Sequence, residues 1–273
     1  MEMTPLAVRS LAGLLEQRTG QQLAAGRRWR LETTLGPILK RLDIDSLDHL
    51  AGLVSTGANP DLTNEVVEAL LNHETSFYRD LAVFRGLAQD ALPRLAAARE
   101  RERRLRIWSA GCSTGQEAYS LAMLLDAQRA QWQGWDVEIL GTDISPVAIA
   151  QARGGLYSQF EAQRGLPITE LIANFDSDRE AWRLKPGLRD RVRFATHNLF
   201  DPPPAGRFDL VLCRNVLLYF VPERRTQVFE RLAEAIAPDG FLMLGAGETV
   251  LHLTDRFEPD PAIKGLYRTR QSA

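Results

Sequence analysis

The sequence predicts an α/β protein in which an all-helical N-terminal domain precedes a doubly wound, mostly parallel sheet. Two observations lead to this fold class. Apolar residues within residues 1–100 recur only at helical spacing, whereas after the charged run 99-RERERR-104 short apolar runs alternate with helical segments. Such alternation is typical of a parallel sheet that is covered on both faces.

A third observation indicates a small inserted antiparallel β subdomain. Glycines and prolines interrupt the alternation within residues 154–191, and 182-WRLK-185 is a candidate strand. The segment is either a small antiparallel element in which this strand pairs with 190-DRVRF-194, or a plain irregular excursion. We therefore expect the following division: a helical domain (1–85), a linker (86–104) and an α/β domain (105–273) that contains the inserted subdomain (about 158–194).

Three groups of apolar residues predict the helices of the N-terminal domain. The groups are Leu6, Leu11, Leu14 and Leu15; Leu31, Leu35, Ile38, Leu39 and Leu42; and Leu47, Leu50, Leu53 and Val54. Gly20, Gly26 and 57-GANP-60 indicate breaks between helices, and Ser46 and Thr63 are candidate N-caps.

The elements of the α/β domain follow from apolar runs and helix boundary signals. The expected strands are 105–110, 137–143, 192–198, 208–215 and 240–246, with one more in the tail 263–270. The expected helices are 115–128, 145–153 and 222–236. The last helix begins with Pro222 and ends before 238-PDG-240, which is the usual placement of proline and glycine around a helix.

Composition excludes several classes of protein. The chain has 273 residues and a formal net charge of −2, so it lacks an overall basic footprint for nucleic acid. It has no apolar run long enough for a membrane span and no secretory signal, which favours a cytoplasmic location without membrane insertion. Cys112 and Cys213 have no His or Cys neighbours at zinc spacing, so we expect reduced, buried thiols and no metal.

The stretch 109-SAGCSTGQEAYS-120 is a candidate nucleotide loop between the first strand and the first helix of the sheet. Gly111 and Gly115 flank this turn, where the absence of a Cβ lets a ligand approach the backbone. No Gly-Lys-Ser/Thr ending follows, which argues against a triphosphate. Asp143 ends the second strand, where a carboxylate suits ribose hydroxyls. These features predict an adenosine-type ligand, either a dinucleotide or S-adenosylmethionine.

Two features favour S-adenosylmethionine over a dinucleotide. The glycines of the loop are four residues apart and do not form the G-x-G-x-x-G pattern of dinucleotide sites. Polar clusters also occur in 72-NHETSFYRD-80, before the sheet, and in 213-CRNVLLYF-220, at the end of a strand. Each residue also has a structural interpretation: a capping box for Glu117, helix entry for Asp143, turns for Asn198 and Asn215, packing for Tyr219 and His73, and a surface pair for Arg79 and Asp80.

Several motifs together resemble the family of CheR-type chemoreceptor methyltransferases, over nearly the whole chain. The motifs are 73-HETSFYRD-80, 107-IWSAGCSTGQEAYSLA-122, 141-GTDIS-145 with 153-RGGLY-157, and 208-FDLVLCRNVLLYF-220 with 238-PDGFLMLGAGE-248. The resemblance implies a Rossmann-like methyltransferase sheet with an inserted antiparallel subdomain. It also implies a protein-glutamate O-methyltransferase that uses S-adenosylmethionine and releases S-adenosylhomocysteine, acting in chemotaxis signal transduction.

The resemblance also implies which residues form the site. Arg79 and Tyr219 correspond to the positions near the reacting groups. The residues expected to bind the cofactor are His73, Thr75, Arg79, Gly111, Glu117, Asp143, Asn198, Leu199, Asn215 and Val216.

The expected partners are the cytoplasmic helices of chemoreceptors, and two departures from the family concern how they dock. Family members that dock on receptor helices often carry a strongly basic N-terminal helix, but in 27-RRWRLETTLGPILKRL-42 the pair Gly36-Pro37 is expected to break or kink the helix. Arg27, Arg28, Arg30, Lys40 and Arg41 keep part of the charge. In some relatives a glycine-rich loop of the inserted subdomain engages a receptor's C-terminal peptide. The stretch 174–187 lacks this loop, so we expect no such tether. Three other functions are alternatives to that of a chemoreceptor methyltransferase: a small-molecule methyltransferase, a non-catalytic S-adenosylmethionine sensor and a nicotinamide dehydrogenase.

Overall fold

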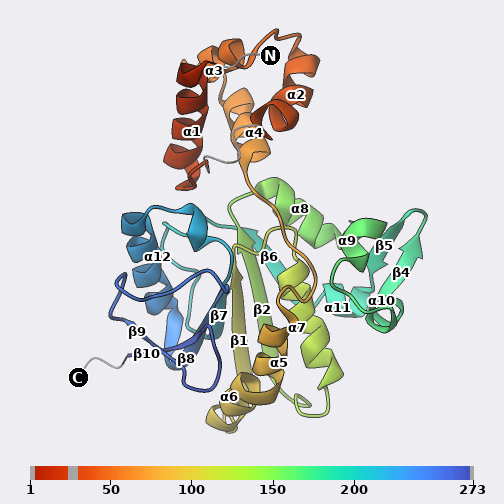
Figure 1. Ribbon diagram of the computed structural model, residues 1–273. Coiled ribbons are helices and arrows are strands. Elements are labelled where there is room, and N and C mark those ends of the chain that lie inside the picture. The colour runs from red at the N-terminus through yellow and green to blue at the C-terminus, as the bar shows by residue number, and fades with distance from the viewer. Residues whose placement is uncertain (1–3, 24–29, 271–273) are drawn as a thin grey trace. The chain divides into compact units, whose positions relative to one another are not determined.

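The computed structural model describes residues 4–23 and 30–270, and the chain divides into two compact units (Figure 1). The first unit contains residues 1–72 and 218–224, and the second contains residues 73–217 and 225–273. The first boundary therefore falls at residue 72, whereas the sequence places it at 85. The reason is that Phe77 and Phe84 are fully buried in the core of the second unit.

The first unit is helical, as predicted. Its helices are α1 (Pro5–Thr19), α2 (Arg30–Leu42), α3 (Leu47–Ser55) and α4 (Pro60–Leu70). Ser46 caps α3 by accepting a hydrogen bond from the His49 N–H, as predicted. The predicted cap at Thr63 is wrong, because Asn59 caps α4 and Thr63 lies inside that helix.

Gly36-Pro37 does not break the helix, because α2 runs through both residues, and the kink stays a prediction. A proline inside a helix costs about 3 kcal/mol. The apolar face of α2 offsets this, since Leu35 and Ile38 are among the buried residues of the unit's core and each buried leucine or isoleucine contributes about 1.5–3 kcal/mol. Of the basic residues named above, Arg27 and Arg28 lie outside the described residues, as does Gly26.

The second unit is built on a seven-stranded sheet in the order β6-β2-β1-β7-β8-β10-β9. The strands are β1 (Arg104–Ala110), β2 (Asp136–Asp143), β6 (Val192–Thr196), β7 (Phe208–Cys213), β8 (Ile236–Leu244), β9 (Phe257–Pro259) and β10 (Leu266–Thr269). The first five are parallel, and β10 and β9 are antiparallel. The predicted doubly wound fold class is therefore confirmed, and β9 is a strand that the sequence did not indicate.

The helices that follow the parallel strands are those expected from the sequence. They are α7 (Gln116–Ala127), α8 (Pro146–Gly154) and α12 (Pro222–Ala235). One boundary differs, because 238-PDG-240 lies within β8 and not in a turn before it. A register irregularity with β7 accommodates these residues, and a Cβ on Gly240 would lie 2.8 Å from the Asp209 carbonyl oxygen.

The linker 86–104 is largely helical, in keeping with the helical spacing of its apolar residues. It contains the end of α5 (Leu81–Gly86), a π-helical turn (Leu87–Ala91) and α6 (Leu92–Ala98). Leu87, Leu92 and Leu95 are at most 1% exposed within the main core. Apolar residues at helical spacing bury one face of this segment, which is why it does not form an extended connection.

The inserted subdomain is a three-stranded sheet in the order β3-β5-β4, formed by β3 (Leu156–Ser158), β5 (Ala181–Leu184) and β4 (Phe175–Asp178). Helices α9 (Gln159–Gln163), α10 (Ile168–Asn174) and α11 (Pro186–Arg189) accompany it. The predicted pairing of 182–185 with 190–194 is wrong, and the subdomain does not extend to 194. Residues 192–196 form β6 beside β2, since Val192 and Phe194 are buried in the main core.

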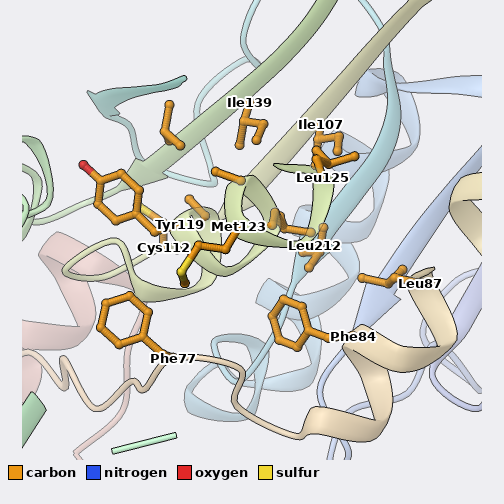
Figure 2. Close-up of a cluster of buried hydrophobic side chains, with 14 of the residues drawn as sticks. Phe77, Phe84, Leu87, Ile107, Cys112, Tyr119, Met123, Leu125, Ile139 and Leu212 are labelled. Carbon is orange, nitrogen blue, oxygen red and sulfur yellow. The ribbon is translucent and has the colours of Figure 1, made fainter. Parts of the chain in front are cut away.

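Both faces of the large sheet are covered. Ile107 and Leu212 belong to the core that Figure 2 shows around Met123 of α7, together with Phe77 and Phe84. Trp108 and Val211 are their neighbours in sequence and point to the other face, yet they are at most 1% exposed. Among the described residues, no helix is both long and apolar enough to cross a bilayer.

Both cysteines are free and fully buried. Burial raises the pKa of the Cys112 and Cys213 thiols well above the ordinary 9.0, and the nearby Glu117 carboxylate adds to this effect for both. The neutral thiol is therefore the stable form in the folded protein.

We expect neither thiol of the native protein to react rapidly with Ellman's reagent at pH 8, and both to react after unfolding in guanidinium. A thiolate is the reactive species, and burial disfavours it. Since the folded pKa values are raised, the thiols' contribution to stability is complete below pH 9 and decreases as the pH rises further, because the unfolded thiols then lose protons. Rapid labelling of the native protein would contradict this assignment.

Candidate functional site

The candidate site lies where the strand order of the large sheet reverses. From β1 the chain proceeds outward through β2 to β6 and then returns to β7 on the other side of β1. In open parallel sheets, ligands bind at the carboxyl ends of the strands at such a switch point. The predicted residues of the second unit follow these strand ends or belong to the segment 73–80.

The loop between β1 and α7 is joined to the end of β2. One carboxylate oxygen of Asp143 accepts from the Ser113 N–H at 2.8 Å, and the other accepts from the Ser145 N–H at 3.0 Å. Ser145 also caps α8, with Pro146 in its first turn. Asp143 therefore fixes the loop and the start of α8, and a carboxylate oxygen can accept more than one hydrogen bond.

Gly111 is required by a close contact within the protein. Its φ is +79°, and a Cβ at this position would lie 2.4 Å from Val216 Cγ2. Its N–H donates to the Thr142 carbonyl at 2.7 Å. The backbone at Gly111 thus packs directly on one of the other predicted site residues.

Several non-glycine residues near these strand ends have left-handed backbone conformations. They are Tyr78, Asp80, Ser113 and Asn215, with φ between 47° and 61°. Such conformations cost roughly 1–3 kcal/mol each and cluster at binding and active sites, where the surrounding structure maintains them. Their concentration at the switch point supports a functional site there.

Glu117 faces an arginine that the sequence interpretation did not select. The Glu117 carboxylate accepts from Ser109 Oγ at 2.8 Å and from the Arg214 guanidinium at 3.0 Å. The Glu117 side chain is 13% exposed and that of Arg214 is 1% exposed. The capping-box interpretation is wrong, because Gly115 is the N-cap of α7 and makes no side-chain cap.

The backbone at Asn215 and Val216 is held by Glu248, also not selected from the sequence. The Glu248 carboxylate accepts from the N–H groups of Asn215, Val216, Leu217 and Gly245, at 2.7–2.9 Å. One side chain thus satisfies four backbone donors of two strand ends, β7 and β8. Arg214 and Glu248 both lie in quoted motifs, so the motifs were the available signal for them.

The segment 73–80 joins the site through backbone groups. Ser113 Oγ donates to the His73 carbonyl at 2.9 Å, and Arg214 donates to the Arg79 carbonyl at 3.0 Å. The Arg79 side chain is half-buried and donates to the Glu74 carbonyl at 2.8 Å. Thr75 is half-buried as well. The surface-pair interpretation does not describe Asp80, since its carboxylate accepts from Arg214 at 2.7 Å.

The remaining predicted residues have separate environments. Asn198 follows β6, and its side chain accepts from the Phe200 N–H at 3.1 Å, which is the turn interpretation of an asparagine. Leu199 is buried. Tyr219 belongs to the first unit, where its hydroxyl accepts a hydrogen bond from Asn72 Nδ2 and its carbonyl accepts from the Gln22 N–H at 2.7 Å.

The charged side chains at these strand ends of the second unit fit an adenosine-type ligand with a cationic amino-acid end. The Asp143 carboxylate at the end of β2 suits ribose hydroxyls, and the Glu117 carboxylate suits an ammonium group. Arg79 offers a guanidinium for a carboxylate. Within the residues that the structure describes, no group of three His, Cys, Asp or Glu side chains is arranged to hold a metal.

Comparison with known proteins agrees with this chemistry. Residues 73–265 match the model of the CheR methyltransferase family, SAM binding domain. Chemotaxis protein methyltransferase 1 of Vibrio cholerae is 34% identical over 254 residues, which cover 92% of this chain and 91% of that protein. Chemotaxis protein methyltransferase 1 of Pseudomonas aeruginosa is 35% identical over 262 residues, covering 94% and 95%.

The chain also overlaps the structure of magnesium protoporphyrin IX methyltransferase from Synechocystis with bound SAM, with a TM-score of 0.31, 22% identity and 60% of each chain covered. That overlap is too small to add to the assignment. The family match spans the switch point and the segment 73–80, and the two relatives match nearly the whole chain. The chain is therefore a member of the CheR methyltransferase family and an S-adenosylmethionine-dependent methyltransferase.

Proposed function

We propose that this protein methylates glutamate side chains of chemoreceptors and so forms glutamyl methyl esters in signalling adaptation. The observation that carries this proposal is the match over more than 90% of both chains to proteins named chemotaxis protein methyltransferase. The product has one negative charge fewer on a receptor helix, which would shift the receptor between its signalling states. The protein would then act in the cytoplasm on the cytoplasmic helices of receptors.

The reaction requires the protein mainly to position the reacting groups. A glutamate side chain has a pKa of about 4.3 and is already ionised at neutral pH, so no strong general base is needed. When bound, S-adenosylmethionine supplies an electrophilic methyl carbon. The carboxylate oxygen forms a bond to this carbon, and the electron pair of the broken carbon–sulfur bond stays on sulfur. The protein's residues must hold the acceptor at a near-attack distance of about 3–3.5 Å and exclude water.

We assign the roles by side-chain chemistry. Asp143 accepts hydrogen bonds from the ribose, and Glu117 binds the amino group. Arg79 donates charge-assisted hydrogen bonds to the cofactor's carboxylate or to the acceptor glutamate. Tyr219 orients the attacking oxygen through its hydroxyl. His73, Thr75, Gly111, Asn198, Leu199, Asn215 and Val216 complete the cofactor-binding set. Docking does not use a C-terminal receptor peptide.

The test is incubation of the protein with tritiated S-adenosylmethionine and cytoplasmic fragments of receptors. We expect base-labile label on glutamates, and a tenfold or greater loss of rate in a Tyr219→Phe variant, since one oriented hydrogen bond of about 1.5 kcal/mol changes a rate roughly tenfold. Fragments in which the labelled glutamates are replaced by alanine serve as the control.

Two outcomes would contradict the proposal. Binding of S-adenosylhomocysteine without label on any receptor fragment would favour a non-catalytic sensor. Label that appears only on small molecules, with receptor fragments left unlabelled, would favour a small-molecule methyltransferase.

A further inference from the structure

Arg214 is the most enclosed cation of the candidate site, and its side chain is 1% exposed. It follows directly after β7. Its guanidinium donates to Glu117 at 3.0 Å, to Asp80 at 2.7 Å and to the Arg79 carbonyl at 3.0 Å. These acceptors belong to α7 and to the segment 73–80, so Arg214 links two regions that are far apart in the sequence.

A structural role alone is a poor explanation for a charge in this place. Removing a cation from water is costly, and apolar residues of similar volume often stabilise a protein equally well or better than buried ion pairs do. The Arg214 Nε–H, moreover, is buried without an acceptor among the described residues. A buried donor without a partner destabilises the fold, which indicates that the arginine serves another purpose.

The geometry around Glu117 shows what that purpose is. One oxygen of the Glu117 carboxylate accepts a hydrogen bond from Ser109 Oγ, on β1, at 2.8 Å. The other oxygen accepts one from the Arg214 guanidinium at 3.0 Å. Two donors on different oxygens define both the position and the rotation of the carboxylate. The same guanidinium holds the Arg79 carbonyl, and therefore the backbone from which the Arg79 side chain extends.

We propose that Arg214 is a positioning residue for the amino-acid end of the cofactor. It acts through Glu117 and through the backbone of Arg79, and it does not itself touch the cofactor or the acceptor. This inference depends on the roles of Glu117 and Arg79 in the proposed function, but it does not depend on the identity of the methyl acceptor.

Comparing the binding of two ligands distinguishes this positioning role from a general effect of the substitution on the fold. S-adenosylhomocysteine has the amino-acid end, whereas 5′-methylthioadenosine has the same nucleoside and lacks that end. In an Arg214→Met variant, we expect the Kd for S-adenosylhomocysteine to rise about tenfold to a hundredfold, as for the loss of one charge-assisted hydrogen bond. The Kd for 5′-methylthioadenosine should change less than about threefold. Arg214→Lys keeps the charge but not the planar arrangement of several N–H donors. Its Kd for S-adenosylhomocysteine should lie between those of the unaltered protein and of Arg214→Met.

Arg99→Met is the matched control. Arg99 is 18% exposed and pairs with Asp209 at 2.8 Å and with Asp239, so its removal also breaks a partly buried ion cluster. We expect it to lower the melting temperature and to leave the ratio of the two Kd values unchanged. Titrations are done at a temperature at which circular dichroism shows each variant folded, and Arg214→Lys substitutes if Arg214→Met does not fold.

Equal weakening of both ligands by the Arg214 substitutions would overturn the inference, as would no change in either Kd. The same selective loss in Arg99→Met would overturn it too. Binding by the unaltered protein without methylation of any receptor would contradict the proposed acceptor only. If the unaltered protein does not bind S-adenosylhomocysteine, both proposals fail.

Discussion

Replacement of Asp143 by alanine is expected to weaken the binding of S-adenosylhomocysteine by about a hundredfold or more, because it removes charge-assisted hydrogen bonds of about 1.5–3 kcal/mol each. Two of these are internal, since the carboxylate holds the N–H groups of Ser113 and Ser145. The others are the bonds that we assign to the ribose. The substitution therefore removes both a ligand contact and the support of the loop.

Isothermal titration with S-adenosylhomocysteine measures this effect, and 5′-methylthioadenosine should lose affinity as well, because it contains the same ribose. This behaviour differs from that expected for Arg214. Asp255→Ala is the control, since Asp255 is exposed in the same unit. An Asp143→Ala protein that binds both ligands as tightly as the unaltered protein would remove the ribose assignment.

Replacement of Glu248 by alanine is expected to destabilise the fold by about 3–5 kcal/mol and to abolish methyl transfer. Its carboxylate accepts from four backbone N–H groups, and each buried donor that is left without an acceptor costs about 1–3 kcal/mol unless water reaches it. The backbone of Asn215 and Val216 would lose its support, and Asn215 has a left-handed φ of 61° that needs such support.

Urea denaturation measures the change in the free energy of unfolding, and Glu248→Gln should show a smaller loss. The glutamine retains one acceptor oxygen, but its amide group faces N–H donors. Glu234→Ala is the control, because Glu234 is exposed and its pair with Arg231 lies at the surface. A loss of less than about 1 kcal/mol in Glu248→Ala, which is the range of ordinary substitutions, would show that the four contacts are not essential.

Local signals in the sequence predicted the helices and parallel strands well. Ser145 and Pro146 mark the start of α8 because capping involves neighbouring residues, and alternation of strand and helix is enough to indicate a covered parallel sheet. Local signals failed where a more distant contact decided the outcome. Gly36-Pro37 did not end α2, since the packing of its apolar face outweighs the lost hydrogen bond.

By itself, the sequence determined the fold class and, through the order and spacing of its motifs, the family and its cofactor. Only the tertiary structure decided how the motifs meet: Asp143 with the Ser113 N–H, Arg214 with Glu117 and the Arg79 carbonyl, and Glu248 with the backbone after β7. The physical reason is that the patterns that indicate a strand or a helix involve residues a few positions apart, whereas these contacts join strand ends that only the folded sheet brings together.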